Sequence, residues 1–269
     1  MRRALAGCLA LSVAAPPLGV FLVLRRMSLM SDVLQHGVLP GIALGAAVGG
    51  LSVWAMGLGG VAAGLVVALL AGWLARRTGG GEDSQLAGLY LVALALGVAL
   101  VSAQRGVDLT HLLFGSVLAV DNPALLAMAG AASLTLPILA VIWRPLVLES
   151  LDPGVMGGTG GLWHGAFLAL VVVCVVSGFE ALGTLMSVGL MMLPAIAARH
   201  FAASLAGQVR ASVVLAVAAS WIGLLVSFHL DLPAGPAIVL SAGGLWAIGL
   251  VFGPCESLRS RLRRVPQIG

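Results

Sequence analysis

Asp32 and His36 are the residues whose types and spacing most readily suggest chemistry in this sequence. They lie four positions apart, so on an α-helix both side chains project from one face, roughly 6 Å apart between Cβ atoms. A carboxylate beside an imidazole can bind a divalent cation. The surrounding stretch, 28–50, is apolar enough to enter a bilayer, where ionisable side chains are costly and usually functional. The competing interpretation is a hydrogen bond between Asp32 and His36 that only holds helices together.

Glu180 is a third ionisable residue in strongly apolar surroundings, within the stretch VVSGFEALGTLM. Its carboxylate could complete a cation path that includes Asp32 and His36. Alternatively, it caps the backbone donors of Gly183 or Thr184 at the end of a helix. The sequence leaves both interpretations open.

Asp108 and His111 form another pair on one helical face, three positions apart in DLTHLLFG. The segment around them, 104–123, is amphipathic and too polar to cross lipid, and we expect an interfacial or half-inserted helix on the outer side. Asp231 lies at the outer end of a later apolar run. These three residues could receive a ligand or contact a partner. The solvent-exposed face of an ordinary amphipathic helix would show the same pattern of polar residues.

The motifs of several enzyme classes are missing. The sequence contains no HExxH, no GxSxG and no GxxxxGK[ST] phosphate loop. The three cysteines, Cys8, Cys174 and Cys255, are far apart and suggest apolar packing, not a thiolate site. We therefore expect neither an enzyme nor a tightly bound cofactor, while an intramembrane metal-dependent enzyme stays an alternative.

Membrane helices must position these residues. The chain has 269 residues, of which 60% are hydrophobic and only 9% are charged, whereas a soluble domain carries about 25% charged residues. Repeated apolar runs of about 20 residues indicate transmembrane helices. We predict an all-α, polytopic membrane protein with one domain, 1–269, and about nine spans, near 5–24, 32–51, 53–74, 85–102, 124–142, 163–179, 183–198, 211–229 and 236–252.

The second of these spans contains signals for a break and for close packing. Pro40 lacks a backbone donor and invites a break one turn after His36. Small residues recur every fourth position after that point and would let another helix approach closely. They are Gly37, Gly41, Gly45 and Gly49.

The arginines give the orientation. All 14 basic residues are arginine, and most lie at the ends of apolar runs, as in cytoplasmic loops of membrane proteins. This distribution predicts an outside N-terminus and an inside C-terminus. It does not indicate nucleic-acid binding.

Four stretches, spread over nearly the whole chain, carry a resemblance to a known family. They are RRMSLMSDVLQHGVLPGIALG (25–45), DLTHLLFGSVLAV (108–120), EALGTLMSVGLMMLPAIAAR (180–199) and DLPAGPAIVLSAGGLW (231–246). In the same order, they resemble motifs of the zinc/manganese-type ABC transporter permeases, where the first motif reads close to RRMSLMGDALSHAVLPGVALG.

The resemblance implies a subunit of the bacterial inner membrane, related in plan to cobalamin and iron-chelate ABC importers. It would work as a homodimer in lipid, with cytoplasmic ABC ATPase subunits and an extracytoplasmic metal-binding protein. Zn²⁺ or Mn²⁺ would be the transported substrate. In the family the Asp and His of the first motif are metal-path residues, and they match Asp32 and His36 here. Glu180 stands where many members have Gln.

The resemblance also places an ATPase-coupling segment at 149–162, a stretch expected to be a cytoplasmic loop beginning at 145. Leu151, Asp152 and Pro153 survive from the family's pattern, while GVMGGTGG, which begins at Gly154, replaces its charged helical part. Together with Glu149, these are the expected coupling residues. The alternatives are a permease for iron chelates or cobalamin-like substrates, and a structural subunit without a path of its own.

Overall fold

The computed structural model describes residues 2–28, 30–50, 52–78, 82–103, 120–151, 160–257 and 259. These residues form ten α-helices joined by short connections, and no strand occurs among them. The helices are α1 (Arg2–Leu24), α2 (Met30–Gly37), α3 (Leu39–Gly49), α4 (Val53–Thr78), α5 (Glu82–Ala103), α7 (Asn122–Leu151), α8 (Gly160–Leu182), α9 (Thr184–Phe201), α10 (Leu205–Leu230) and α11 (Ala234–Phe252).

The predicted all-α, multi-pass fold is confirmed. Within the described residues, eight helices are long and apolar enough to cross a membrane: α1, α4, α5, α7, α8, α9, α10 and α11. The short helices α2 and α3 follow each other where the second span was expected. Counting them as one broken crossing gives a total close to the predicted nine.

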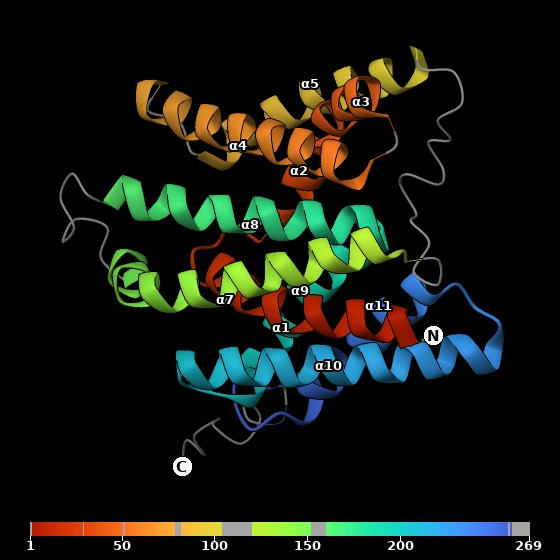
Figure 1. The fold of residues 1–269 in the computed structure, drawn as a ribbon. Coiled ribbons are helices and arrows are strands. Elements are labelled where there is room, and N and C mark those ends of the chain that lie inside the picture. Colours follow the sequence, from red (N-terminus) through yellow and green to blue (C-terminus); the bar gives the residue numbers. More distant parts are fainter. Residues whose placement is uncertain are drawn as a thin grey trace.

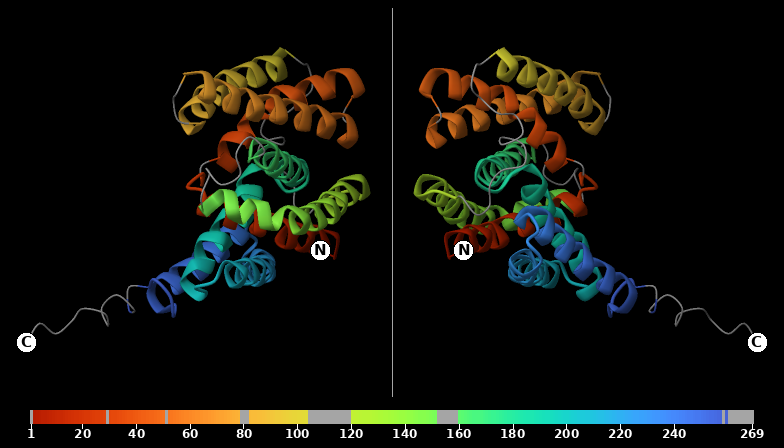
Figure 2. Two further views of the ribbon diagram at one scale, coloured as in Figure 1. Left: turned by 90° about the vertical axis from the view of Figure 1, so that its left-hand side faces the viewer. Right: turned by 90° about the vertical axis from the view of Figure 1, so that its right-hand side faces the viewer.

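The helices form layers around α8. Figure 1 shows α3, α4 and α5 as one layer, α2 and α8 beneath it, and α7, α1, α9 and α10 beyond them. The side views in Figure 2 show the same order, with α8 between α4 and α7. The main buried core follows α1, α8 and α9, whereas few residues of α4, α5 and α11 are buried.

The second span, expected near 32–51 with a break at Pro40, is broken two residues before that proline. The chain turns at Val38, so α2 ends at Gly37 and α3 begins at Leu39. Pro40 lies in the first turn of α3, where a missing backbone N–H removes no helical hydrogen bond. The break therefore precedes Pro40, because the ring starts a helix more easily than it interrupts one.

The loop expected from 145 onwards begins later. Helix α7 continues through Pro145 to Leu151, and α8 already begins at Gly160. The polar end of α7 is helical because its side chains have partners: the Ser150 hydroxyl donates to the Leu146 carbonyl oxygen at 2.6 Å, and Glu149 forms an ion pair. Asp152, Pro153 and Gly154 lie outside the described residues.

Helices α3 and α4 approach closely along the glycine stripe. A Cβ atom on Gly41 would collide with the Gly59 carbonyl oxygen, and one on Gly45 would collide with the Ala55 carbonyl oxygen. Gly49 faces the Ala55 methyl group in the same way. A Cβ atom on Gly37, at the end of α2, would lie at ordinary contact distance from Val67, 3.4 Å. Backbone-to-backbone approach thus occurs at two of the four glycines, Gly41 and Gly45, and Gly49 adds a close contact with a side-chain methyl group.

Candidate metal-binding site

Helix α2 is held by buried side chains on one face. It packs against α4, α5 and α8, and it also touches α9. Met30 and Leu34 are buried on this face, and the Gln35 side-chain amide donates to the Thr184 carbonyl oxygen at 2.7 Å. Asp32 and His36 are the less buried polar residues of this helix. Their orientation is therefore fixed by packing of the rest of α2.

The middle of the bundle surrounds the end of α2. Val38, at the turn, lies against the position of Gly64 in α4, and Val172 of α8 lies against the same glycine. Gly64 and Val172 are both near the centres of their spans. The C-terminal end of α2, which carries His36, therefore lies near the middle of the bundle, at a depth where a charged side chain is costly.

The structure brings Asp32 and His36 together. His36 Nε2 lies 3.9 Å from Asp32 Oδ1, which is too long for a hydrogen bond. Zn²⁺ binds nitrogen and oxygen ligands at about 2.0–2.2 Å, so two atoms at this separation can contact one ion between them. The side chains of His36 and Asp32 are 29% and 58% exposed, so an ion can reach the pair.

The second ring nitrogen of His36 lies in a less polar setting. Nδ1 is buried and has no hydrogen-bond partner among the described residues, and the Tyr90 ring lies 6.1 Å from the imidazole between centroids. A histidine that binds a metal tightly usually donates its other N–H to a fixed partner. Among the described residues, no such partner holds the His36 ring.

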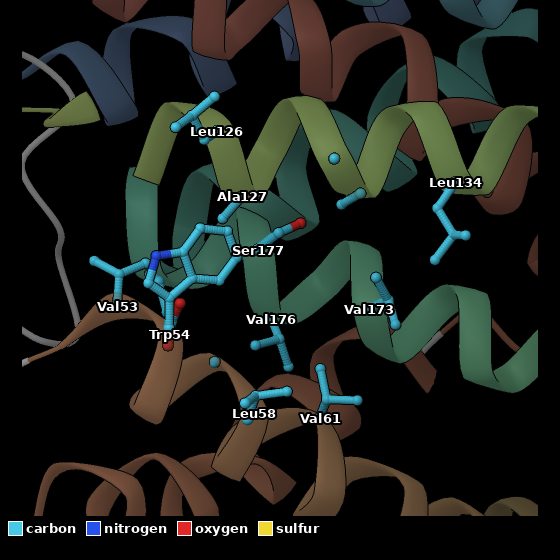
Figure 3. A pocket seen from close by; sticks show the side chains of 14 residues that line it. Val53, Trp54, Leu58, Val61, Leu126, Ala127, Leu134, Val173, Val176 and Ser177 are labelled. Carbon is cyan, nitrogen blue, oxygen red and sulfur yellow. The ribbon is translucent and has the colours of Figure 1, made fainter. Parts of the chain in front are cut away.

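Glu180 does not join this pair. No group of three His, Cys, Asp or Glu side chains placed to hold a metal occurs within the described ranges. Glu180 instead lines a cavity of about 220 Å³ between α4, α7 and α8, whose wall is otherwise apolar except for Ser177. Figure 3 shows Trp54 of α4 and Leu126 of α7 at this cavity. One carboxylate oxygen of Glu180, Oε1, is buried and has no partner in the described structure.

The expected outer-side residues are only partly described. Asp108 and His111 lie outside the described residues, as does most of 104–123. The last two positions of that segment, 122–123, are the first residues of α7. Asp231 is exposed and ends α10 in the left-handed conformation, with φ 51°. It is placed at a helix end, where a partner could contact it.

Glu149, an expected coupling residue, does not point freely into solution. Its Oε2 lies 2.9 Å from Nη2 of Arg25, and the side chains of Arg25 and Glu149 are only 8% and 15% exposed. The sequence did not predict this pairing, because an arginine at the end of an apolar run indicates only the orientation of the chain. The sequence does contain a signal for this ion pair: Glu149 follows one long apolar run, and Arg25 lies at the end of another.

The comparisons with known proteins agree with this architecture. The model of the ABC 3 transport family matches residues 1–253. A manganese transport system membrane protein, MntC, of Halalkalibacterium halodurans is 29% identical, covering 98% of this chain and 91% of its own. The manganese import system permease protein ScaB of Streptococcus parasanguinis is 30% identical, covering 94% and 91%. The solved structure of PsaBC from Streptococcus pneumoniae in complex with Fab has a TM-score of 0.84 at 28% identity, covering 97% of this chain and 94% of its own.

The chain belongs to the ABC 3 transport family, as its four motifs predicted. It is a multi-pass bacterial membrane protein and a permease subunit, not an enzyme.

Proposed function

We propose that this protein is the permease subunit of an ATP-driven importer of divalent transition-metal ions, with Mn²⁺ the favoured cargo. The observation that carries the proposal is the 3.9 Å separation between His36 Nε2 and Asp32 Oδ1 on a helix in the middle of the bundle. Several relatives are named as manganese permeases, which supports Mn²⁺ over Zn²⁺. One oxygen and one nitrogen ligand do not by themselves select between these ions.

A homodimer would complete the path. Asp32 is 58% exposed in a single chain, and a carboxylate facing lipid at this depth is unfavourable. A passage between two copies would remove it from lipid and could bring two Asp–His pairs together. The two pairs together would replace the water around the ion, and they would have to release it again on the other side.

The partners in this proposal are cytoplasmic ABC ATPase subunits and an extracytoplasmic metal-binding protein, in the inner membrane. The binding protein would dock on the outer face, near Asp231, Asp108 and His111. The ATPase would act on the 149–162 segment. Glu149 would contribute through its contact with Arg25, because its carboxylate is covered.

A second candidate is a permease for chelated iron. It is favoured by a relative named chelated iron transport system membrane protein YfeD, of Yersinia pestis, which is 27% identical to this chain. A chelate surrounds its metal with its own ligands, so transport of one would not need Asp32 and His36 as metal ligands.

Uptake by the reconstituted complex tests the proposal. Vesicles containing the permease, its ATPase and the binding protein should accumulate Mn²⁺ only when ATP is present. A ferric chelate in tenfold excess should leave Mn²⁺ uptake unchanged. Uptake of the chelate with no uptake of free Mn²⁺ or Zn²⁺ would favour the second candidate and overturn the first.

A further inference from the structure

Arg25 joins three helices, because its contact residues on α7 and α8 lie between 121 and 139 positions further along the chain. It follows the end of α1, and its guanidinium reaches the end of α7 and the start of α8. Its Nε donates to the Ser150 hydroxyl at 3.1 Å, and its Nη2 donates to Glu149 Oε2 at 2.9 Å and to the Leu146 carbonyl oxygen at 3.4 Å. Nη1 lies 2.8 Å from His164 Nδ1. We call these five residues the Arg25 cluster.

The chemistry of the guanidinium fixes the direction of each bond. Arginine has five N–H donors in a rigid plane and no acceptor. His164 Nδ1 must therefore accept, which places its proton on Nε2. A lysine could not reach the same acceptors at once, because its ammonium is a single point of charge.

An aromatic layer closes the cluster on one side. The Arg25 guanidinium lies over the Phe167 ring, 5.2 Å from its centroid. Phe167 meets Phe21 of α1 edge to face at 6.2 Å, and Phe21 meets Trp143 of α7 at 5.1 Å. The same three helices thus share a polar contact and an apolar contact at one level, so a displacement of one helix end strains both.

The backbone continues from Arg25 to α2 through a hydrogen-bonded connection. The Met27 N–H donates to the Leu22 carbonyl oxygen at 2.8 Å, and the Arg26 N–H donates to the Val23 carbonyl oxygen at 3.1 Å. This pair of bonds is the Schellman motif, which commonly ends helices. Arg26 has φ 61°, as this motif requires. The Met30 N–H, at the start of α2, donates to the Met27 carbonyl oxygen at 3.0 Å.

We propose that Arg25 is the positioning residue that carries movement of the α7 and α8 ends to α2. These two ends flank the segment expected to contact the ATPase, and α2 carries Asp32 and His36. The inference rests on the proposed function for the identity of the cargo. The mechanical link from the α7 and α8 ends to α2 does not depend on the cargo.

The test compares Arg25→Gln with Arg26→Gln in the full complex. Arg26 is the next residue and is exposed. The Arg26→Gln variant therefore removes the same charge at the same end of α1 without disturbing the Arg25 cluster. Two quantities are measured: metal ions transported per ATP hydrolysed, and the ATP-induced change in hydrogen exchange of the backbone amides in 30–37. The second quantity requires no knowledge of the cargo.

We expect Arg25→Gln to hydrolyse ATP, to transport at least tenfold less metal per ATP, and to lose the change in exchange of α2. Arg26→Gln should retain both. If Arg25→Gln does not assemble, Arg25→Lys and Ser150→Ala replace it and should lower the ratio by a smaller factor.

A normal transport ratio in a folded Arg25→Gln complex would overturn the proposal, as would a wild-type complex in which ATP leaves exchange in α2 unchanged. If the wild-type complex transports no metal ion but shows the ATP-induced change, and Arg25→Gln loses it, the assigned cargo is wrong and the role of Arg25 stands.

Discussion

At the scale of single residues, the Asp32–His36 pair and Glu180 have different surroundings. Asp32 and His36 face each other across 3.9 Å and are accessible. Glu180 lies in an apolar cavity with an unpartnered oxygen, outside any three-residue metal cluster among the described positions. The spacing of four in the sequence predicted the first pair. It could not place Glu180, because that position depends on how α8 packs against α4.

Glu180→Gln separates a packing role from a role in the metal path. Burying a charge costs far more than burying a neutral amide, so we expect the variant to keep Mn²⁺ uptake within about twofold and to raise the Tm in detergent. Glu256→Gln is the control, because Glu256 forms an exposed pair with Arg199 at 3.2 Å. Loss of uptake with normal ATP hydrolysis would instead place Glu180 in the path.

At the scale of helices, the apolar runs predicted where most spans lie, because burial in lipid requires long, continuous stretches. They could not predict that α7 continues to Leu151, because the polar end of α7 is stabilised by Arg25, more than 100 residues earlier. The break in the second span was expected from Pro40, and it occurs at Val38 because Pro40 fits the first turn of α3. Side-chain partners distant in sequence thus decide where a helix ends.

The α3–α4 contact provides a test at this scale. Gly41→Ala would push a methyl group into the Gly59 carbonyl oxygen, and overpacking of this kind costs about 1–3 kcal/mol. Gly88→Ala, in α5, is the matched control because no atom lies within 4 Å of its added methyl group in the described structure. Replacing that helical glycine should be neutral or stabilising, by up to about 1 kcal/mol.

Thermal unfolding in detergent would measure both alanine variants. A lower Tm for Gly41→Ala and an unchanged or higher Tm for Gly88→Ala are expected. Equal Tm values would mean that the close approach of α3 and α4 does not limit stability.

At the scale of the whole molecule, the layered bundle places the broken crossing α2–α3 beside α4, α5 and α8 and connects its start to the ends of α1, α7 and α8 (Figure 1). The helical, multi-pass class and the family could be predicted from composition and four motifs. The Arg25 cluster could not, since its members become neighbours only when three helices assemble. In our account this arrangement lets ATPase-driven movement at one end of the bundle change access to a site in its middle.

The measurement that tests this account most directly is ATP-dependent Mn²⁺ uptake by the complex carrying Asp32→Asn or His36→Gln. Asp32→Asn keeps the shape of the side chain but removes its charge, and His36→Gln keeps a polar side chain but removes the imidazole nitrogen, so each variant weakens binding of the ion. His229→Gln is the control, because His229 is exposed and bonds within its own helix, to the Leu225 carbonyl oxygen at 2.8 Å. We predict at least a tenfold loss of uptake in the first two variants and wild-type uptake in the third. Wild-type uptake in both Asp32→Asn and His36→Gln would contradict the account.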